Sequence, residues 1–248
     1  MKIGVQLYTV RDLMNADPAG TLKAVGKMGY RYVEAAGTAG KTTKEFASMA
    51  RDAGLKFCGM HVGYDQCEKQ IDQVLQDAEI LDCPYIVVPG LPERAYADGW
   101  DRCGIRLQKF GERIAKAKRK FGFHNHSGEF VKVGDRTAYD IMTESSCPDH
   151  MLLEVDLWWA HCGGQNVPDL LKTHGDRVHL VHLKDVSSCN AETHAPAGQG
   201  EMDWPPVLKA LDGCRTAFGI GEFDTCPGDP LAAIKASLTY FRAAGYKG

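Results

Sequence analysis

Histidine and carboxylate side chains follow several short apolar segments of the chain, each near the C-terminal end of its segment. They are His61, His124 with His126 and Glu129, Glu154 with Asp156, His182 with Lys184, and Glu222 with Asp224. Imidazole and carboxylate groups without thiolate are the donors that Mn, Mg, Co, Fe or Zn take in proteins. A mixed nitrogen and oxygen set with open positions suits catalysis by Lewis acidity. The pattern predicts one divalent metal ion, with Mn favoured, provided that the fold brings these segment ends together.

The segment 152–157 shows the pattern most clearly. On a strand the side chains alternate between two faces, so Leu152, Glu154 and Asp156 share one face and the apolar residues between them share the other. Two acids on one face of a buried strand are costly unless positive charge meets them. Lys184 is one candidate partner for Glu154, and a bound cation is another.

Eight short apolar segments alternate with segments of helical periodicity. Strands are expected at 2–7, 32–35, 56–61, 85–88, 121–126, 152–157, 178–184 and 217–222. Helices are expected between them, among others at 18–28, 68–81, 137–145, 168–174 and 204–211. Eight such units in 248 residues are typical of a closed (β/α)8 TIM barrel. An open doubly wound sheet is the alternative, but no G-x-G-x-x-G follows the first strand. We expect a single α/β domain over residues 1–248.

A barrel would gather the polar strand ends at one face, where the active sites of such barrels lie. Each residue alone has an ordinary explanation, because a lone histidine is more often a hydrogen-bonded structural residue and a lone acid often faces solvent or caps a helix. The coincidence of five strands ending in His, Asp or Glu is what favours a metal site.

Composition narrows the class of protein. The net charge is −3 and no long run of Lys and Arg occurs, so neither a nucleic acid nor a membrane surface is an expected partner. No apolar stretch reaches the roughly 20 residues that span a bilayer. The nine cysteines form no C-x-x-C pair, which indicates reduced thiols and a cytoplasmic location. The stretch Val186 to Met202 is the longest irregular one and could be a mobile loop over the site.

Several runs resemble the xylose isomerase-like TIM-barrel superfamily, in particular its sugar phosphate isomerase/epimerase members, which are similar to inosose dehydratases and 3-keto-glycoside-processing enzymes. The runs are His124-Asn125-His126-Ser127-Gly128-Glu129-Phe130, Asp156-Leu157-Trp158-Trp159-Ala160, His182-Leu183-Lys184-Asp185, Gly198-Gln199-Gly200-Glu201-Met202-Asp203-Trp204 and Gly221-Glu222-Phe223-Asp224. They occur in family order and cover nearly the whole chain.

The resemblance implies a divalent metal held by an acid from strand five, an Asp from strand six, a His from strand seven and a Glu from strand eight. The last three match Asp156, His182 and Glu222. His124 stands where many relatives carry the acid, so Glu129 is expected as the fourth ligand, with His126 as the rival.

The implied chemistry is isomerisation or epimerisation of a keto-sugar or polyol through a metal-stabilised enediolate. Glu129, Glu222 and His126 are the candidates for moving the proton. Lys184 could stabilise the oxyanion, or it could only pair with Glu154 or Asp185. Substrate contacts are expected from His61, His124, Trp158 and Trp204, although aromatic residues are as often core.

Three alternatives remain at this stage. A lyase of the same fold would expel a β-substituent, as in an inosose dehydratase or a 3-keto-glycoside β-elimination. A metal-dependent abasic-site endonuclease would need a basic groove. A non-catalytic barrel would bind a sugar without turnover. The expected partner is a small sugar or polyol, and barrels of this kind often form a homo-oligomer or pair with a partner subunit.

Overall fold

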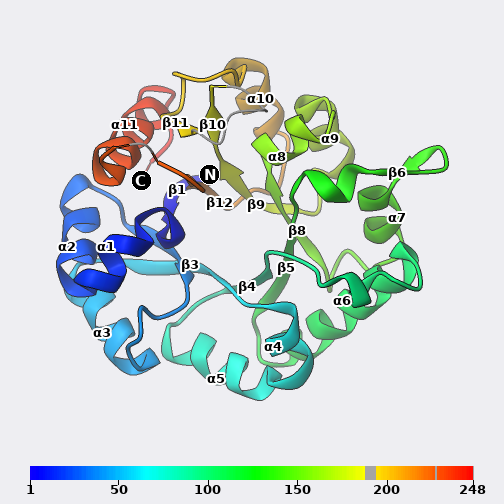
Figure 1. Ribbon diagram of the computed structural model, residues 1–248, viewed down its shortest axis with the longest axis horizontal. Coiled ribbons are helices and arrows are strands. Elements are labelled where there is room, and N and C mark those ends of the chain that lie inside the picture. The colour runs from blue at the N-terminus through cyan, green and yellow to red at the C-terminus, as the bar shows by residue number, and fades with distance from the viewer. Residues whose placement is uncertain (188–193, 227, 248) are drawn as a thin grey trace.

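A computed structural model of the protein describes residues 1–187, 194–226 and 228–247. Eight parallel strands close into a barrel, in the order β1-β12-β9-β8-β5-β4-β3-β2. Viewed along its axis, the barrel is ringed by helices (Figure 1). Its strands are β1 (Lys2–Gln6), β2 (Tyr32–Ala36), β3 (Lys56–His61), β4 (Tyr85–Val88), β5 (Lys120–His124), β8 (Leu152–Asp156), β9 (Val178–Leu183) and β12 (Phe218–Gly221). The expected (β/α)8 barrel is confirmed.

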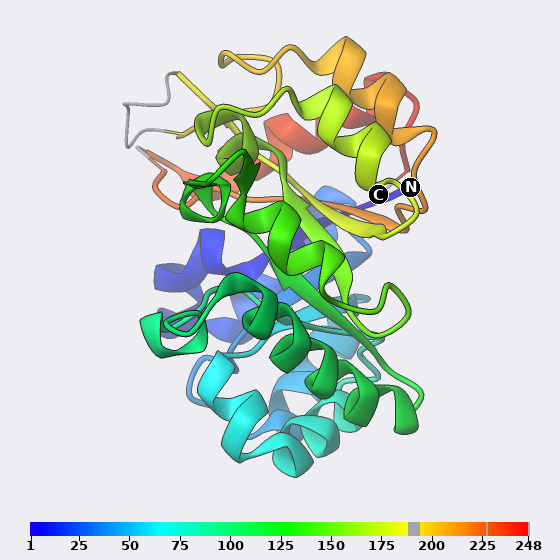
Figure 2. The same ribbon diagram turned by 90° about the vertical axis from the view of Figure 1, so that its right-hand side faces the viewer.

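The helices lie outside the strands, and the two chain termini lie at the same end of the barrel (Figure 2). The α-helices are α1 (Arg11–Ala16), α2 (Pro18–Met28), α3 (Thr43–Asp52), α4 (Tyr64–Lys69), α5 (Ile71–Ile80), α6 (Trp100–Lys116), α7 (Ala138–Glu144), α8 (Leu157–Cys162), α9 (Val167–His174), α10 (Trp204–Leu211) and α11 (Pro230–Ala243). Short 3-10 helices are η1 (Leu7–Val10), η2 (Glu93–Ala95) and η3 (Ser127–Phe130). Two small hairpins pair β6 (Lys132–Val133) with β7 (Arg136–Thr137), and β10 (Asp185–Val186) with β11 (His194–Ala195). No helix in the described ranges is long and apolar enough to cross a bilayer.

Helix α2 illustrates how the sequence sets element boundaries. The Asp17 side chain accepts the backbone N–H of Gly20, and Pro18 occupies the first turn, where no intrahelical N–H bond is lost. Gly29 ends the helix with φ of 107°, a left-handed conformation that a residue with a Cβ rarely adopts. The buried face of the helix, Leu22 and Val25, packs toward the barrel core.

The strands alternate as their sequences predict, which gives the barrel two cores. Residues on the outer strand faces pack under the helices, and Val155 and Val181 belong to this larger core. The inward faces form a smaller apolar cluster: Cys58, Tyr85, Val87, Leu152, Leu180, Phe218 and Ile220. Above this cluster, toward the strand C-termini, the inward side chains become polar, as in the series Leu152, Glu154, Asp156.

The sequence placed the elements well and their ends less well. The expected strands 121–126 and 217–222 end earlier, so His126 and Glu222 lie just beyond β5 and β12. The expected helix 68–81 is divided into α4 and α5 at Gln70. Helix α8 was not expected: it begins directly after β8, where Asp156 accepts the backbone N–H of Trp159 at 2.9 Å.

The irregular stretch 186–202 is fastened at both of its described ends by one carboxylate. Asp185, which is buried, accepts the backbone N–H groups of Val186, Gly198, Gly200 and Met202, and the indole N–H of Trp204. Residues 188–193 of the expected mobile loop lie outside the described residues.

Candidate metal centre

Four buried side chains converge at the C-terminal end of the barrel. His124, Asp156, His182 and Glu222 place one potential ligand atom each within 4.8 Å of one another. They come from β5, β8 and β9 and from the residue that follows β12. Strand register explains the convergence, because Asp156 lies beside His182 in the pairing of β8 with β9. Glu222 follows the segment of β12 that pairs with β9 around His182.

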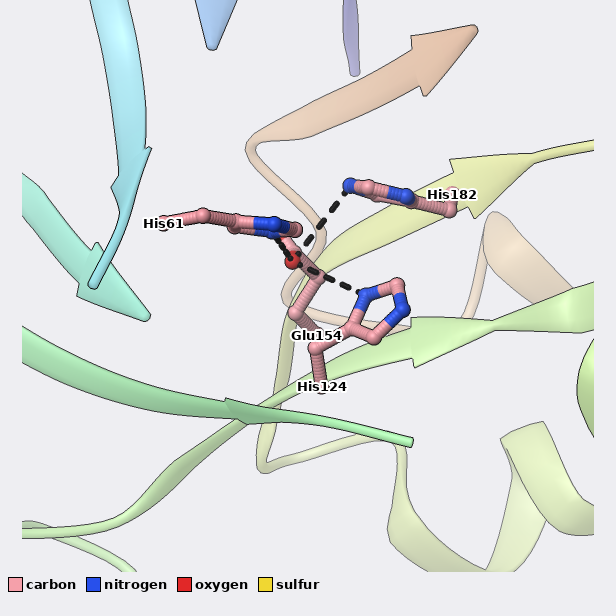
Figure 3. A group of neighbouring side chains, drawn as sticks. All are labelled: His61, His124, Glu154 and His182. Carbon is pink, nitrogen blue, oxygen red and sulfur yellow. Dashed lines mark hydrogen bonds and ion pairs between the residues drawn. The ribbon is translucent and has the colours of Figure 1, made fainter. Parts of the chain in front are cut away.

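A second group shares two of these histidines and lies around Glu154. It consists of His61, His124, Glu154 and His182, again within 4.8 Å. Figure 3 shows the three imidazole rings arranged around one Glu154 oxygen. That oxygen, Oε2, lies 2.7 Å from His61 Nε2, 3.1 Å from His124 Nδ1 and 3.4 Å from His182 Nε2.

Glu34 on β2 completes the carboxylate lining of this second group. Its Oε2 lies 2.8 Å from His182 Nε2 and 3.2 Å from His61 Nε2. Gln6, its neighbour on β1, donates its side-chain amide to the same oxygen at 2.9 Å. The rings of His61 and His182 stack at 5.3 Å with an interplanar angle of 8°. Both imidazoles are therefore fixed by carboxylates and by each other.

Lys184 is buried among three carboxylates. Its Nζ lies 2.9 Å from Asp156 Oδ2, 2.8 Å from Glu222 Oε2 and 2.8 Å from Asp224 Oδ1. Lys184 therefore pairs with these acids and not with Glu154 or Asp185, the two partners considered from the sequence. Burial alone would lower the pKa of Lys184, but Asp156, Glu222 and Asp224 outweigh it and raise the pKa above its usual value. Its amine stays protonated.

Neighbouring side chains of the site have pKa values shifted in different directions by burial and by nearby charge. Burial, together with the nearby charge of Glu34, raises the pKa of Glu154 to about 7. Burial opposes protonation of His61, but Glu34 and Glu154 outweigh it and raise its pKa to about 10. Burial and the positive charge of His182 lower the pKa of His124 well below its usual value. The site thus holds His61 charged and His124 neutral near pH 7.

Negative charge exceeds positive charge in this part of the barrel. Five carboxylates face each other, against three groups that carry a proton and a positive charge. The carboxylates are those of Glu34, Glu154, Asp156, Glu222 and Asp224, and the cations are Lys184, His61 and His182. Within the described ranges, Glu34 Oε1 and Glu154 Oε1 are buried and accept no hydrogen bond, whereas Asp156 Oδ2 is paired with Lys184. Two imidazoles and two carboxylates in this surplus of buried negative charge are a donor set that fits a divalent cation of the borderline transition-metal type.

Three of the four expected ligands lie together in the structure, and the fourth does not. Asp156, His182 and Glu222 lie together as expected, and the fourth member of their group is His124. Glu129 is in neither group; it lies in η3, where its Oε2 accepts the backbone N–H of His126 at 2.7 Å. Burial raises the pKa of Glu129. The ring of His126 lies 5.0 Å from that of His124.

The two tryptophans expected to contact substrate lie in the hydrophobic core. Trp204 is 1% exposed and donates its indole N–H to Asp185. Trp158 is 2% exposed and packs within the same core. Helix α8, which the sequence did not predict, directs Trp158 into the core. Trp159 is only partly buried, and its ring lies 5.8 Å from Lys184 Nζ.

Some contributors to the site were not assigned a role from the sequence. Gln6, Glu34 and Glu154 are polar strand residues, but nothing in their spacing ties them to particular imidazoles. Asp224 lies 3.4 Å from Nε2 of His194, a buried histidine on β11 that the sequence gave no reason to select.

A pocket of about 530 Å³ opens above these groups at the barrel mouth. It is lined by Tyr8, Ala36, His61, Gly63, Pro89, His124, His126, Glu222 and Asp224. The volume lies in the range of small-molecule sites. The candidate ligands His124 and Glu222 thus face a space that can admit a small molecule.

The chain matches the family described as Xylose isomerase-like TIM barrel over residues 22–244, and it belongs to that family. Among curated proteins it is similar to an inosose dehydratase of Lacticaseibacillus casei, with 24% identity over 151 residues. That match covers 61% of this chain and 45% of the relative, so the chain matches less than half of the relative's length.

Solved structures share the fold over the whole chain. A sugar phosphate isomerase/epimerase from Parabacteroides distasonis superposes with a TM-score of 0.83 at 24% identity, covering 97% of both chains. A structure described as IOLI protein with a binding zinc atom gives a TM-score of 0.77 at 15% identity, covering 98% of this chain and 97% of that one. The similar proteins thus carry the names of a dehydratase and of a sugar phosphate isomerase/epimerase.

Proposed function

We propose that the protein is a divalent-metal-dependent isomerase or epimerase that acts on a keto-sugar or polyol. The observation that carries this proposal is the convergence of His124, Asp156, His182 and Glu222 beneath a pocket of small-molecule size. The zinc atom named for the IOLI protein supports a metal ion in a barrel of this fold. In this proposal His124 is the fourth ligand in place of Glu129, because His124 lies with the other three candidate ligands and Glu129 does not.

The bound cation would supply Lewis acidity that makes the proton beside a substrate carbonyl easier to remove. Glu222 is a poor acceptor for that proton. Burial would raise its pKa, but Lys184 and His182 outweigh burial and lower the pKa well below its usual value. A carboxylate with a low pKa is a weak base.

His126 is the better proton acceptor. It lines the pocket, it is partly exposed, and its ring lies between those of His124 and Trp159, at 5.0 and 5.7 Å. The backbone of His126 is held by a hydrogen bond from its N–H to the carboxylate of Glu129. Lys184 acts as a fixed positive charge that holds Asp156 and Glu222 in place, and His61 lines the pocket.

Dehydration is the second candidate reaction, and the similarity to inosose dehydratases favours it. Removal of the same proton, followed by departure of a hydroxyl group from the next carbon, would give an unsaturated product and water. The two reactions share the site and the first step, and they differ only in where the electron pair goes.

One experiment separates these outcomes. The protein would be loaded with Mn²⁺ and incubated in D₂O with a panel of keto-sugars, inososes and polyols, followed by proton NMR. Deuterium at the carbon beside the carbonyl, with a new epimer or isomer, supports the proposal; an unsaturated product supports the second candidate. Asp156→Ala should lose both Mn²⁺ retention and turnover, whereas Asp72→Ala, an exposed acid on α5, should keep both. Full turnover by chelator-treated Asp156→Ala protein would exclude metal-dependent catalysis at this site.

A further inference from the structure

Each of the two shared histidines presents its two ring nitrogens to different carboxylates. His182 turns Nδ1 to Glu222, at 2.6 Å, and Nε2 to Glu34, at 2.8 Å. His124 turns Nε2 toward Asp156 Oδ2, at 3.8 Å, and Nδ1 to Glu154, at 3.1 Å. One nitrogen of each ring therefore faces the candidate ligands, and the other faces a carboxylate deeper in the barrel.

A neutral imidazole has one N–H and one lone pair, so a ring that binds a cation through one nitrogen carries its proton on the other. That N–H requires an acceptor when it is buried. Glu34 and Glu154 lie at hydrogen-bond distance from the nitrogens that face away from Asp156 and Glu222. Partners of this kind fix the tautomer of a ligating histidine and raise its basicity.

We propose that Glu34 and Glu154 are positioning residues, which accept the Nε2–H of His182 and the Nδ1–H of His124 so that a single cation is held on the opposite nitrogens. This inference rests on the proposed function for the existence of the cation. It assigns no second cation to the group around Glu154, although that group also has convergent donors.

A second cation would need the nitrogens that these carboxylates already engage. His182 and His124 would each have to bridge two ions, with both of their ring nitrogens deprotonated. Neutral histidine is the usual ligand form, so this arrangement is unfavourable. The Glu154 oxygen also occupies the point on which the three rings converge (Figure 3).

The strands hold Glu34 in the orientation that this role needs. Gln6 donates to the oxygen that faces His182, and the two residues are paired in register between β1 and β2. On the other side, Gly59 of β3 is paired with Glu34, and a Cβ at position 59 would collide with Glu34 Oε1. Glycine at this position therefore makes room for the carboxylate.

The tautomers can be observed directly in the Zn²⁺-loaded protein labelled with ¹⁵N-histidine. Long-range proton–nitrogen spectra should show the proton on Nε2 of His182 and on Nδ1 of His124, with the zinc-bound nitrogens opposite. The reversed assignment for both rings, or loss of both ring protons, would overturn the proposal. This readout concerns proton positions and does not depend on turnover.

Calorimetric titration with Mn²⁺ tests the energetic consequence. The native protein should bind one equivalent, and Glu34→Gln and Glu154→Gln should each weaken binding by about 10–100-fold. Gly59→Ala should weaken it in the same direction by displacing Glu34. Gly122→Ala is the matched control, because its Cβ would lie 3.4 Å from Val87 Cγ2, an ordinary contact, and its Mn²⁺ affinity should be unchanged.

The outcomes also separate this inference from the proposed function. If the native protein binds no metal, the proposed function fails. If it binds one equivalent and the Glu34 and Glu154 variants bind equally well, only the positioning role fails. Two equivalents in the native protein, with one lost in Glu154→Gln, would replace the positioning role by a second cation site.

Discussion

The two ends of the barrel interior contain similar residue types in opposite surroundings. His179 and His182 both lie on β9, three residues apart. At the strand N-termini, burial and the nearby charges of Lys120 and Arg215 lower the pKa of His179 to about 4. At the strand C-termini, burial has the same direction, but Glu154 and Glu222 outweigh it and raise the pKa of His182 well above its usual value. The neighbours, and not the strand, decide what each histidine can do.

Aromatic rings replace carboxylates at the N-terminal end. Lys2 lies 5.0 Å from the ring of Tyr32 and 5.6 Å from that of Phe218, and Lys120 lies 5.2 Å from the ring of Tyr85. The Tyr85 hydroxyl lies 3.2 Å from His179 Nδ1. Cations on ring faces at the edge of an apolar layer close the barrel without creating a need for a bound ion. The difference suggests that one end contributes stability and the other contributes chemistry.

Replacing the two histidines should give the largest contrast. His182→Ala removes a proposed ligand, so Mn²⁺ affinity should fall by more than the 10–100-fold expected for loss of a partner of a ligand. His179→Ala removes only a hydrogen bond with Tyr85, and its Mn²⁺ affinity should match that of the native protein. Calorimetric titration of both variants with Mn²⁺ measures the two affinities. An equal loss of affinity in the two variants would contradict the difference between the two ends of the barrel.

The two ends of the barrel should also differ in how much stability the protein loses when a lysine is replaced. Lys184→Met removes the lysine cation that Asp156, Glu222 and Asp224 share, and removing one partner of a buried pair costs about 3–5 kcal/mol. Lys2→Met loses an exposed cation–π contact of about 1 kcal/mol or less. Urea unfolding in the presence of a chelator gives both free energies. Added Mn²⁺ should recover part of the loss in Lys184→Met and none of the loss in Lys2→Met.

The smallest expected effects concern pH. The folded pKa of His61, about 10, lies above the unfolded value of about 6.5, so His61 binds its proton more tightly in the folded state. Its contribution is complete below pH 6.5 and is lost as the pH rises through about 10. His179 has the opposite sign, since its folded pKa of about 4 makes stability fall as the pH drops from 6.5 to 4.

The free energy of unfolding of the chelator-treated protein, measured in urea, should therefore fall both at alkaline pH and at acid pH. His61→Asn should flatten the alkaline side, and His179→Asn the acid side. A variant that flattens the other side would contradict the assignment. Mn²⁺ affinity should rise with pH in the native protein, because the metal must displace the proton that His182 holds.

The alternation of apolar segments predicted the barrel, and the resemblance to the family selected Asp156, His182 and Glu222, whose side chains the structure brings together. Alternation along 152–157 placed Glu154 and Asp156 on one face, and parallel strand ends must meet at one rim. The ligand from strand five could not be chosen in this way. His124, His126 and Glu129 all follow the same apolar segment, and only the register with Glu154 and the turn of η3 decide which one points inward.

Trp158 and Lys184 illustrate the two other limits. The run after Asp156 is as apolar as a strand, so helix α8, and with it the inward turn of Trp158, depends on a cap that periodicity does not reveal. From the sequence, Glu154 and Asp185 were the partners considered for Lys184. The stagger of neighbouring strands in a closed barrel instead brings it to Asp156, Glu222 and Asp224.

Asp185 has a consequence for how a substrate reaches the pocket. Swinging the segment from Gly198 to Trp204 outward would break four of the hydrogen bonds that converge on this carboxylate, leaving a buried anion with the backbone N–H of Val186 as its remaining donor among those described. Outward movement of that segment would therefore be costly. The pocket is lined by other loops, which include Tyr8, Gly63 and Pro89, so access to it does not require that movement.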